Sequence, residues 1–210
     1  NAATELAKLI NNNTSVHGTV ASAFNELTSL QKANFTMSET FKINGDLVEI
    51  ATSNADLVRL INRDVSEVTA VLNTDGTIKL SNDNGDDIIF ADNGGAGATM
   101  QGAVDVGLIS SLTDTTHTGF IKLENLDGSP IKIEAANIQN GYSTDVGTIA
   151  DLQALGFNEV NDDKSISSGT VSSNAITTAH DIKINDVGIG VSATASAASK
   201  ALAINEKTSE

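Results

Sequence analysis

Two segments of the chain, residues 4–11 and 55–62, carry apolar residues at the i, i+3 and i+4 positions of a helix face. The predicted apolar faces are Leu6, Leu9 and Ile10 in the first segment and Leu57, Leu60 and Ile61 in the second. Asn54 is the predicted N-cap of the second helix, because its side chain can accept a hydrogen bond from an exposed N–H. Each segment closes on Ile-Asn, and an Asn there fits a helix end because it tolerates the left-handed conformation.

Alternating apolar and polar residues predict strands, with turn signals between them. Asp75-Gly76 predicts a hairpin between residues 68–72 and 77–80. Asp127-Gly128-Ser129-Pro130 predicts a turn between strands at residues 120–126 and 131–135, since Gly allows positive φ and Pro fixes φ. Gly85 marks a turn before the short apolar run that begins at Ile88.

The patterns repeat along the chain. Phe-Lys-Ile-Asn-Gly-Asp at residues 41–46 precedes the helix at 55–62, and Ile-Lys-Ile-Asn-Asp-Val-Gly-Ile at 182–189 precedes a helix-like segment at 199–205. The helix at residues 4–11 has no such strand before it. Internal repetition sets the architecture. Here it predicts that the chain begins and ends within repeats.

This ordered set resembles the hypervariable outer region of bacterial flagellins, whose flagellin IN motif combines an Ile-Asn-Gly strand with an Ala-Ile-Asn helix. The resembling segments are residues 40–50, 68–80, 119–134 and 149–157, with a weaker stretch over 91–118. Residues 20–30 fit a helix or a strand, and the resemblance implies a strand. Asp186 departs from the Gly of the motif, and the terminal helices of flagellins are absent from this sequence.

We predict an α+β, β-rich fold of small, mostly antiparallel sheets, each packed with a short helix, in repeated IN-type units. One core should unite Ile43, Leu57, Ile61, Val71, Ile78 and Leu80. Polar, Ser- and Asp-rich residues 161–173 predict a boundary near residue 162. The predicted domains are residues 1–162, built of IN-type repeats and a β-hairpin insertion, and residues 163–210, a second, incomplete IN-type unit.

Composition narrows the function. The 12 Lys and Arg against 27 Asp and Glu give a formal charge of −15, which repels nucleic acids and anionic membranes. No apolar run approaches the ~20 residues that span a bilayer. The chain has no cysteine, which excludes disulfides and thiolate zinc sites. With six Phe, one Tyr and no Trp, the core must rest on aliphatic residues.

The resemblance implies a structural component of the flagellar filament: secreted, extracellular, surface-exposed and serving motility, with other flagellin subunits as partners. The isolated chain is expected to be monomeric, because the polymerising helices are not in it. One alternative is a hook-associated or filament-cap protein, since such proteins share the motif. Another is a glycan-binding surface adhesin module, which exposed stacked aromatic residues would favour.

Asp83-Asn84-Gly85-Asp86-Asp87 contains calcium-binding residue types but lacks the spaced ligands and distal Glu of an EF-hand loop. We predict a tight turn with solvated carboxylates. The three histidines share no metal-site spacing and are predicted to be exposed turn residues: His17, His117 and His180. The sequence has no Gly-x-Ser-x-Gly elbow and no phosphate-binding loop. The prediction is no enzyme, with no catalytic, cofactor-binding or metal residues and no cofactor.

Flagellins of several bacteria carry O-linked sugars on exposed Ser and Thr. The resemblance therefore makes two polar stretches candidate O-glycosylation sites. The candidate residues are Ser165, Ser167, Ser168, Thr170, Thr115 and Thr116.

Overall fold

A computed structural model describes residues 2–31, 34–95, 97, 99–113, 115–135, 147–160, 166–167, 173–180 and 182–208. The chain divides into two compact units, Asn1–Ile131 and Lys132–Glu210. Both combine helices with antiparallel strands, so the fold is α+β and β-rich, as predicted. The boundary predicted near residue 162 falls in residues 161–165, which lie outside the described residues, and it stays a prediction.

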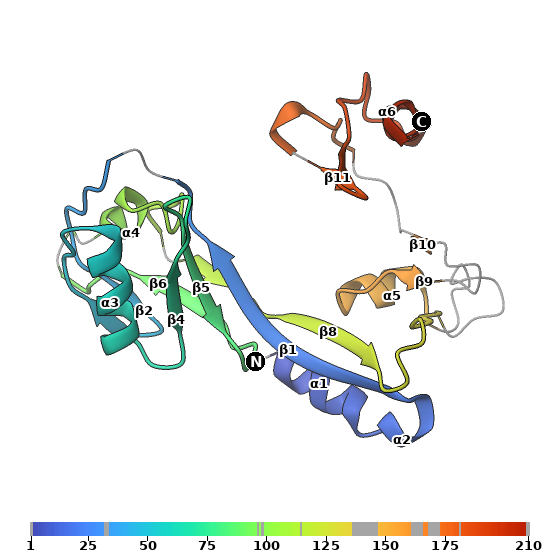
Figure 1. Cartoon of the computed structure of the whole chain (residues 1–210), viewed down its shortest axis with the longest axis horizontal. Coiled ribbons are helices and arrows are strands. Elements are labelled where there is room, and N and C mark those ends of the chain that lie inside the picture. Colours follow the sequence, from blue (N-terminus) through green and yellow to red (C-terminus); the bar gives the residue numbers. More distant parts are fainter. Residues whose placement is uncertain are drawn as a thin grey trace. The chain divides into compact units, whose positions relative to one another are not determined.

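The first unit contains two four-stranded antiparallel sheets, with strand orders β4-β5-β1-β8 and β3-β2-β6-β7 (Figure 1). Its elements in chain order are α1 (Ala2–Asn11), α2 (Thr14–His17), β1 (Thr19–Thr28), β2 (Phe41–Ile43), β3 (Asp46–Val48), α3 (Asn54–Asp64), β4 (Thr69–Leu72), β5 (Ile78–Asn82), β6 (Ile88–Ala91), α4 (Gln101–Asp105), β7 (Thr115–His117) and β8 (Phe120–Asn125).

Strand β1 is the longest strand of this unit and pairs with two other strands. Its residues 19–24 pair with β8 and its residues 25–28 pair with β5 (Figure 1). Buried Ala21 and Asn25 alternate with exposed Ser22, Phe24 and Glu26, which is the period of a strand with one covered face. The strand prediction for this segment is confirmed.

Helix α1 packs on β1 with a different face from the predicted one. Ala3 and Ala7 are buried, Leu6 and Ile10 are half-buried, and Leu9 is 64% exposed. Because Ala3 and Ala7 are small, the helix lies close to the strand on its alanine side. Leu9 lies beside that face, so its predicted burial is wrong.

Helix α3 packs its predicted apolar face into the hydrophobic core of the unit. Leu57, Leu60 and Ile61 are buried. They share one cluster with Ile43, Ile78 and Leu80 of the strands, and with Phe41 and Phe90, whose ring centroids lie 6.3 Å apart. Val71 is the exception in the predicted core, because it is 45% exposed and its neighbour Ala70 faces inward instead.

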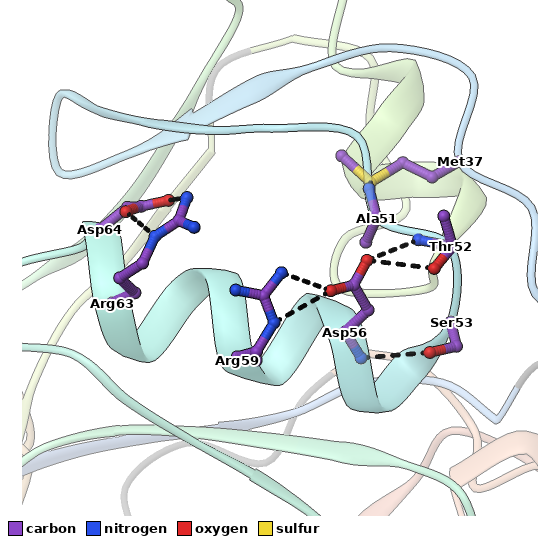
Figure 2. Close-up of polar contacts among 8 residues, drawn as sticks. All are labelled: Met37, Ala51, Thr52, Ser53, Asp56, Arg59, Arg63 and Asp64. Carbon is purple, nitrogen blue, oxygen red and sulfur yellow. Dashed lines mark hydrogen bonds and ion pairs between the residues drawn. The ribbon is translucent and has the colours of Figure 1, made fainter.

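The start of α3 is fixed by polar contacts (Figure 2). Ser53, rather than Asn54, is the N-cap: its side chain accepts a hydrogen bond from the Asp56 N–H at 3.1 Å. Asp56 Oδ2 accepts from the Thr52 N–H at 3.0 Å, and Asp56 Oδ1 accepts from Arg59 Nη2 at 2.6 Å. Asn54 instead donates from its side chain to the Gly76 carbonyl in the β4–β5 turn, which ties the helix to the hairpin.

The two predicted turns have different strands around them. Strands β4 and β5 pair across Asp75-Gly76, with Gly76 at φ 85°. The Asp127–Pro130 segment also turns, with Gly128 at φ 72°, but residues 131–135 do not return along β8. Strand β8 pairs with β1 instead, and Ile133 bridges Val160. The turn prediction is confirmed, whereas the strand predicted at residues 131–135 is reduced to the single bridge residue Ile133.

In the second unit, α5 begins with a capping box between Thr148 and Asp151. The strands of the second unit form two antiparallel sheets of two strands each in the described part. The elements are α5 (Ile149–Ala154), β9 (Glu159–Val160), β10 (Ile166–Ser167), the 3-10 helix η1 (Thr178–His180), β11 (Lys183–Ile184), β12 (Val187–Gly188) and α6 (Ala197–Thr208).

Leu57→Ala should lower the free energy of unfolding of the first unit by roughly 2–5 kcal/mol, because it removes a fully buried side chain and leaves a cavity. Val71→Ala, a truncation on half-exposed β4, is the matched control and should cost clearly less. Urea unfolding followed by circular dichroism measures both. Equal costs would contradict the packing of α3.

Asp56→Ala should reveal a pH-dependent contribution to stability. The Thr52 N–H, and then Arg59, lower the pKa of Asp56 below its ordinary 3.8. A lowered folded-state pKa means that this stabilisation is present above 3.8 and is lost as the pH falls through the folded pKa. Urea midpoints of both proteins should therefore differ by a constant amount above about pH 5 and converge in acid. A difference that does not vary with pH would refute the contribution.

Candidate functional site

Ile-Asn pairs recur along the chain, and in three of them the Asn side chain bonds the backbone of a strand. At the end of α1, Asn11 Nδ2 donates to the Ala21 carbonyl at 2.8 Å, and Asn11 Oδ1 accepts from the Ala21 N–H at 2.7 Å. Near the end of α3, Asn62 makes the same two contacts with Ala70, at 2.9 and 2.7 Å. We call this two-bond contact the asparagine bracket.

Each bracketed alanine lies where its strand has no neighbour on one side. Ala21 pairs with Leu123 of β8, while β5 joins β1 only from Asn25 onward. Ala70 pairs with Leu80 of β5, and β4 is the last strand of its sheet. An open strand edge exposes unpaired N–H and C=O groups that invite another strand. The bracket satisfies one residue of that edge from within the molecule.

Asn44 performs a related task at the turn between β2 and β3. The ladder between β2 and β6 runs to Ile43 and Phe90, and Asn44 then turns with φ 52°. Its N–H still donates to the Ile89 carbonyl at 2.8 Å, while its side-chain Oδ1 accepts from the Ile89 N–H at 2.8 Å. The side chain thus replaces a strand carbonyl and extends the ladder by one residue.

Only a side-chain amide offers a donor and an acceptor at this reach, because a carboxylate is acceptor-only and a hydroxyl presents one atom. This explains the choice of Asn. It also corrects the predicted role of the helix-closing residues: Asn11 and Asn62 do not have positive φ, and α3 continues to Asp64.

The Asp83–Asp87 segment is a turn, as predicted, and a buried amide organises it. Asn82 Oδ1 accepts from the Asn84 N–H at 2.8 Å and from the Asp86 N–H at 3.3 Å. Asp83 is exposed, whereas Asp86 and Asp87 are half-buried. Among the described residues, no three His, Asp or Glu side chains come together in a group that could hold a metal ion.

Sequence reasoning missed the role of Asn25, the register partner of Asn82. Both residues are 1% exposed, and Asn25 Nδ2 donates to the carbonyls of Asp86 and His117. The available signal was an amide at an inward position of an alternating strand. Gly85 and Gly119 meet beside this pair, where a Cβ on Gly119 would overlap the Gly85 carbonyl. The buried amides therefore join β1, the turn and β7.

The three histidines lie in different environments. His17 is exposed, and its Nδ1 accepts from the Thr19 N–H at 3.1 Å. His180 is exposed, and its Nδ1 accepts from the Thr177 N–H at 2.9 Å. His117 is not an exposed turn residue: it lies in β7, packs edge-on against Phe90, and has a buried Nε2 without a hydrogen-bond partner in the described part. It also lines an open recess of about 230 Å³ beside Leu27 and Ile109.

The candidate glycosylation residues divide between strand β7 and the second unit. Thr116 is exposed, whereas Thr115 is half-buried and donates to the Thr113 carbonyl. Ser165, Ser168 and Thr170 lie outside the described residues, as does the side chain of Ser167 in β10. Exposure leaves Thr116 as the most accessible of the described candidates.

No family model matches the chain, and no curated protein matches it. None of the helices in the described residues combines the length and apolar character needed to cross a membrane.

Asn62→Ala should destabilise the first unit by about 1–3 kcal/mol, because both backbone groups of buried Ala70 lose their partners on that side. Asn62→Asp should also destabilise it at neutral pH, since a carboxylate can accept from the Ala70 N–H but would face the Ala70 carbonyl. Hydrogen exchange of the Ala70 amide and urea unfolding measure the effect.

Asn205→Ala is the matched control, because Asn205 ends the same Ile-Asn pattern but is exposed, and its side chain makes no hydrogen bond within the described part. It should leave stability unchanged. If Asn62→Ala is equally silent, the bracket has no energetic role.

Proposed function

We propose that this chain is a non-catalytic structural module, the surface-exposed outer domain of a flagellin in the extracellular filament. The observation that carries the proposal is the ordered Ile-Asn repeat. It combines a hairpin that turns at Ile-Asn with a helix that carries Ile-Asn near its end, and it resembles the motif of that family. The proposed partners are neighbouring flagellin subunits.

The hydrogen bonds that cover the open strand edges support a role on a crowded filament. Domains carried side by side at high density must not pair through their strand edges. The brackets of Asn11 and Asn62 occupy two such edges, and the net charge of −15 adds repulsion between copies.

A non-catalytic role also fits the polar residues that the structure describes. The rings of His17 and His180 bond to neighbouring backbone groups, and the buried amides of Asn25 and Asn82 hold a turn. Catalysis needs a nucleophile, a base and an electrostatic stabiliser around one substrate position. Those contacts give each group a structural explanation, and the proposal assigns no substrate.

Immunogold labelling of intact filaments with antibodies to the chain tests the proposal. Label along the whole shaft is expected for a filament subunit. Label confined to the tip or to the hook junction would overturn it in favour of a cap or hook-associated protein. Glycan-array binding without any filament label would favour the adhesin alternative, for which Phe24 and Phe120 form an exposed aromatic pair with ring centroids 5.6 Å apart.

The isolated chain should sediment as a monomer at micromolar concentration and low salt, because like charges oppose close approach. Added salt to about 0.5 M should screen the repulsion and allow weak association at most, since the Debye length falls well below 10 Å. Analytical ultracentrifugation at both salt concentrations is the measurement. A tight dimer at low salt would argue against a decorating domain.

A further inference from the structure

Asn-Gly pairs are places where a protein chain can modify its own backbone. Because glycine has no side chain, its nitrogen can approach the side-chain carbonyl of the preceding Asn and close a five-membered succinimide ring. This chain has such pairs at residues 44–45, 84–85, 93–94 and 140–141. The last pair lies outside the described residues. Two of the others share the tripeptide Asp-Asn-Gly, at residues 83–85 and 92–94, so the structure distinguishes them at equal local sequence.

The first two pairs are held by native contacts. Asn44 Oδ1 accepts from the Ile89 N–H, and the Asn44 N–H donates to the Ile89 carbonyl, both at 2.8 Å. Gly85 is buried, and its N–H donates to the Asn82 carbonyl at 3.3 Å. A Cβ on Gly85 would lie only 2.5 Å from the Ala23 Cβ, so this peptide is tightly packed. Both pairs would have to break these contacts to close the ring.

The pair Asn93-Gly94 is exposed and lies in a different set of contacts, directly after β6. Asp92 Oδ1 accepts from the Gly94 N–H at 2.6 Å. Asn93 Oδ1 accepts from the Gly95 N–H at 3.0 Å. Asn93 Nδ2 donates to Thr40 Oγ1, also at 3.0 Å, which anchors the amide to the segment before β2. Each polar atom of this pair that takes part in ring closure therefore has a polar neighbour.

These contacts match the needs of an attack by the Gly94 nitrogen on the side-chain carbonyl of Asn93. The Asp92 carboxylate can take the N–H proton, as a general base does. The Gly95 N–H faces the oxygen on which negative charge develops, as an oxyanion donor does. The Lys42 ammonium lies close as well, since its Nζ is 3.5 Å from the position of a Cβ on Gly94. A positive charge there favours the same development of negative charge.

We propose that Asn93 is a self-modification site, which the folded chain converts to aspartate and isoaspartate. The Gly94 nitrogen bonds to Cγ of Asn93 and gives its proton to Asp92. That proton returns through solvent to the leaving NH2 group, which departs as ammonia. Water then opens the succinimide at either of its two carbonyls, so the net reaction consumes one water and releases one ammonia. The inference concerns covalent chemistry and does not depend on a filament role.

The product changes the charge and the contacts of this segment. A carboxylate replaces a neutral amide next to Asp92, so the chain gains one negative charge. The amide donor to Thr40 is lost. Isoaspartate also adds one methylene to the backbone between β6 and the residues that follow it. Conversion should therefore be detectable in the mass and in the charge of the intact chain.

The test holds the full chain at neutral pH and physiological temperature in heavy-oxygen water, which labels each new carboxylate. Samples are digested with a protease that is active in acid and analysed by mass spectrometry. In the folded chain, Asn93 should convert faster than Asn84 by about tenfold or more, because a positioned general base contributes at least that much. In urea the two Asp-Asn-Gly sites should convert at equal rates, since the contacts that distinguish them are lost.

Two substitutions separate the carboxylate from the loop sequence. Asp92→Asn keeps an oxygen that can accept from the Gly94 N–H but cannot take its proton, and it should slow conversion of Asn93 by about tenfold or more. Asp83→Asn is the matched control, because Asp83 is exposed and precedes Asn84 in the same tripeptide. It should leave the rate at Asn93 unchanged. Circular dichroism checks that both variants are folded.

Three results would overturn the proposal. The first is an equal rate at Asn93 and Asn84 in the folded chain. The second is conversion of Asn93 that is insensitive to Asp92→Asn. The third is a peptide around Asn93 that is covalently joined to the Lys42 peptide, because it would assign the released ammonia to a cross-link.

Discussion

A strand at the edge of a small sheet must find partners for its outward N–H and C=O groups, and this requirement organises the first unit. Extra strands are the usual solution, but here a helix supplies one side chain at the critical residue. Asn11 and Asn62 project from the last turns of α1 and α3 and bracket alanines that are otherwise paired on one side only. The bracket fixes how far each helix lies from its strand. It therefore also sets which helix face meets the core.

This link between the bracket and the helix face explains several burial patterns that hydrophobic periodicity alone could not predict. Leu57 and Ile61 were predicted to be buried because their spacing matches a helix over a sheet, and they are. Val71 was assigned to the wrong face of β4. Its burial depends on which backbone groups Asn62 reaches, and the bracket turns Ala70 inward. Similarly, the alanine side of α1 lies against β1, and Leu9 remains outside. The sequence was enough to predict whether each of these segments is a helix or a strand. Which of its side chains point into the core depends on a contact between elements.

Strand pairing can be predicted from this sequence where it is local, but not where it joins distant segments. The β4–β5 hairpin follows from Asp75-Gly76, because a tight turn fixes its own register. The Asp127–Pro130 turn carries an equally clear signal, yet β8 pairs with β1. A turn signal in the sequence predicts that the chain reverses direction. It does not predict which strand the neighbouring segment pairs with. The buried pair of Asn25 and Asn82 was missed for the same reason, since its partners lie in the Asp83–Asp87 turn and in β7.

The pairing of β1 with β8 also constrains the order of folding. Thr19 and Asn125, which face each other in the ladder, are 106 residues apart. Closing so long a loop costs entropy before its contacts form, so the local β4–β5 hairpin and α3 can assemble earlier. A chain that emerges from a ribosome, N-terminus first, holds β1 without β8 until nearly the whole unit has emerged. During that interval the bracket from Asn11, which needs only ten residues of chain, can protect the waiting strand. The contact that satisfies the open edge of β1 in the folded unit would then also protect this strand from wrong pairing during folding.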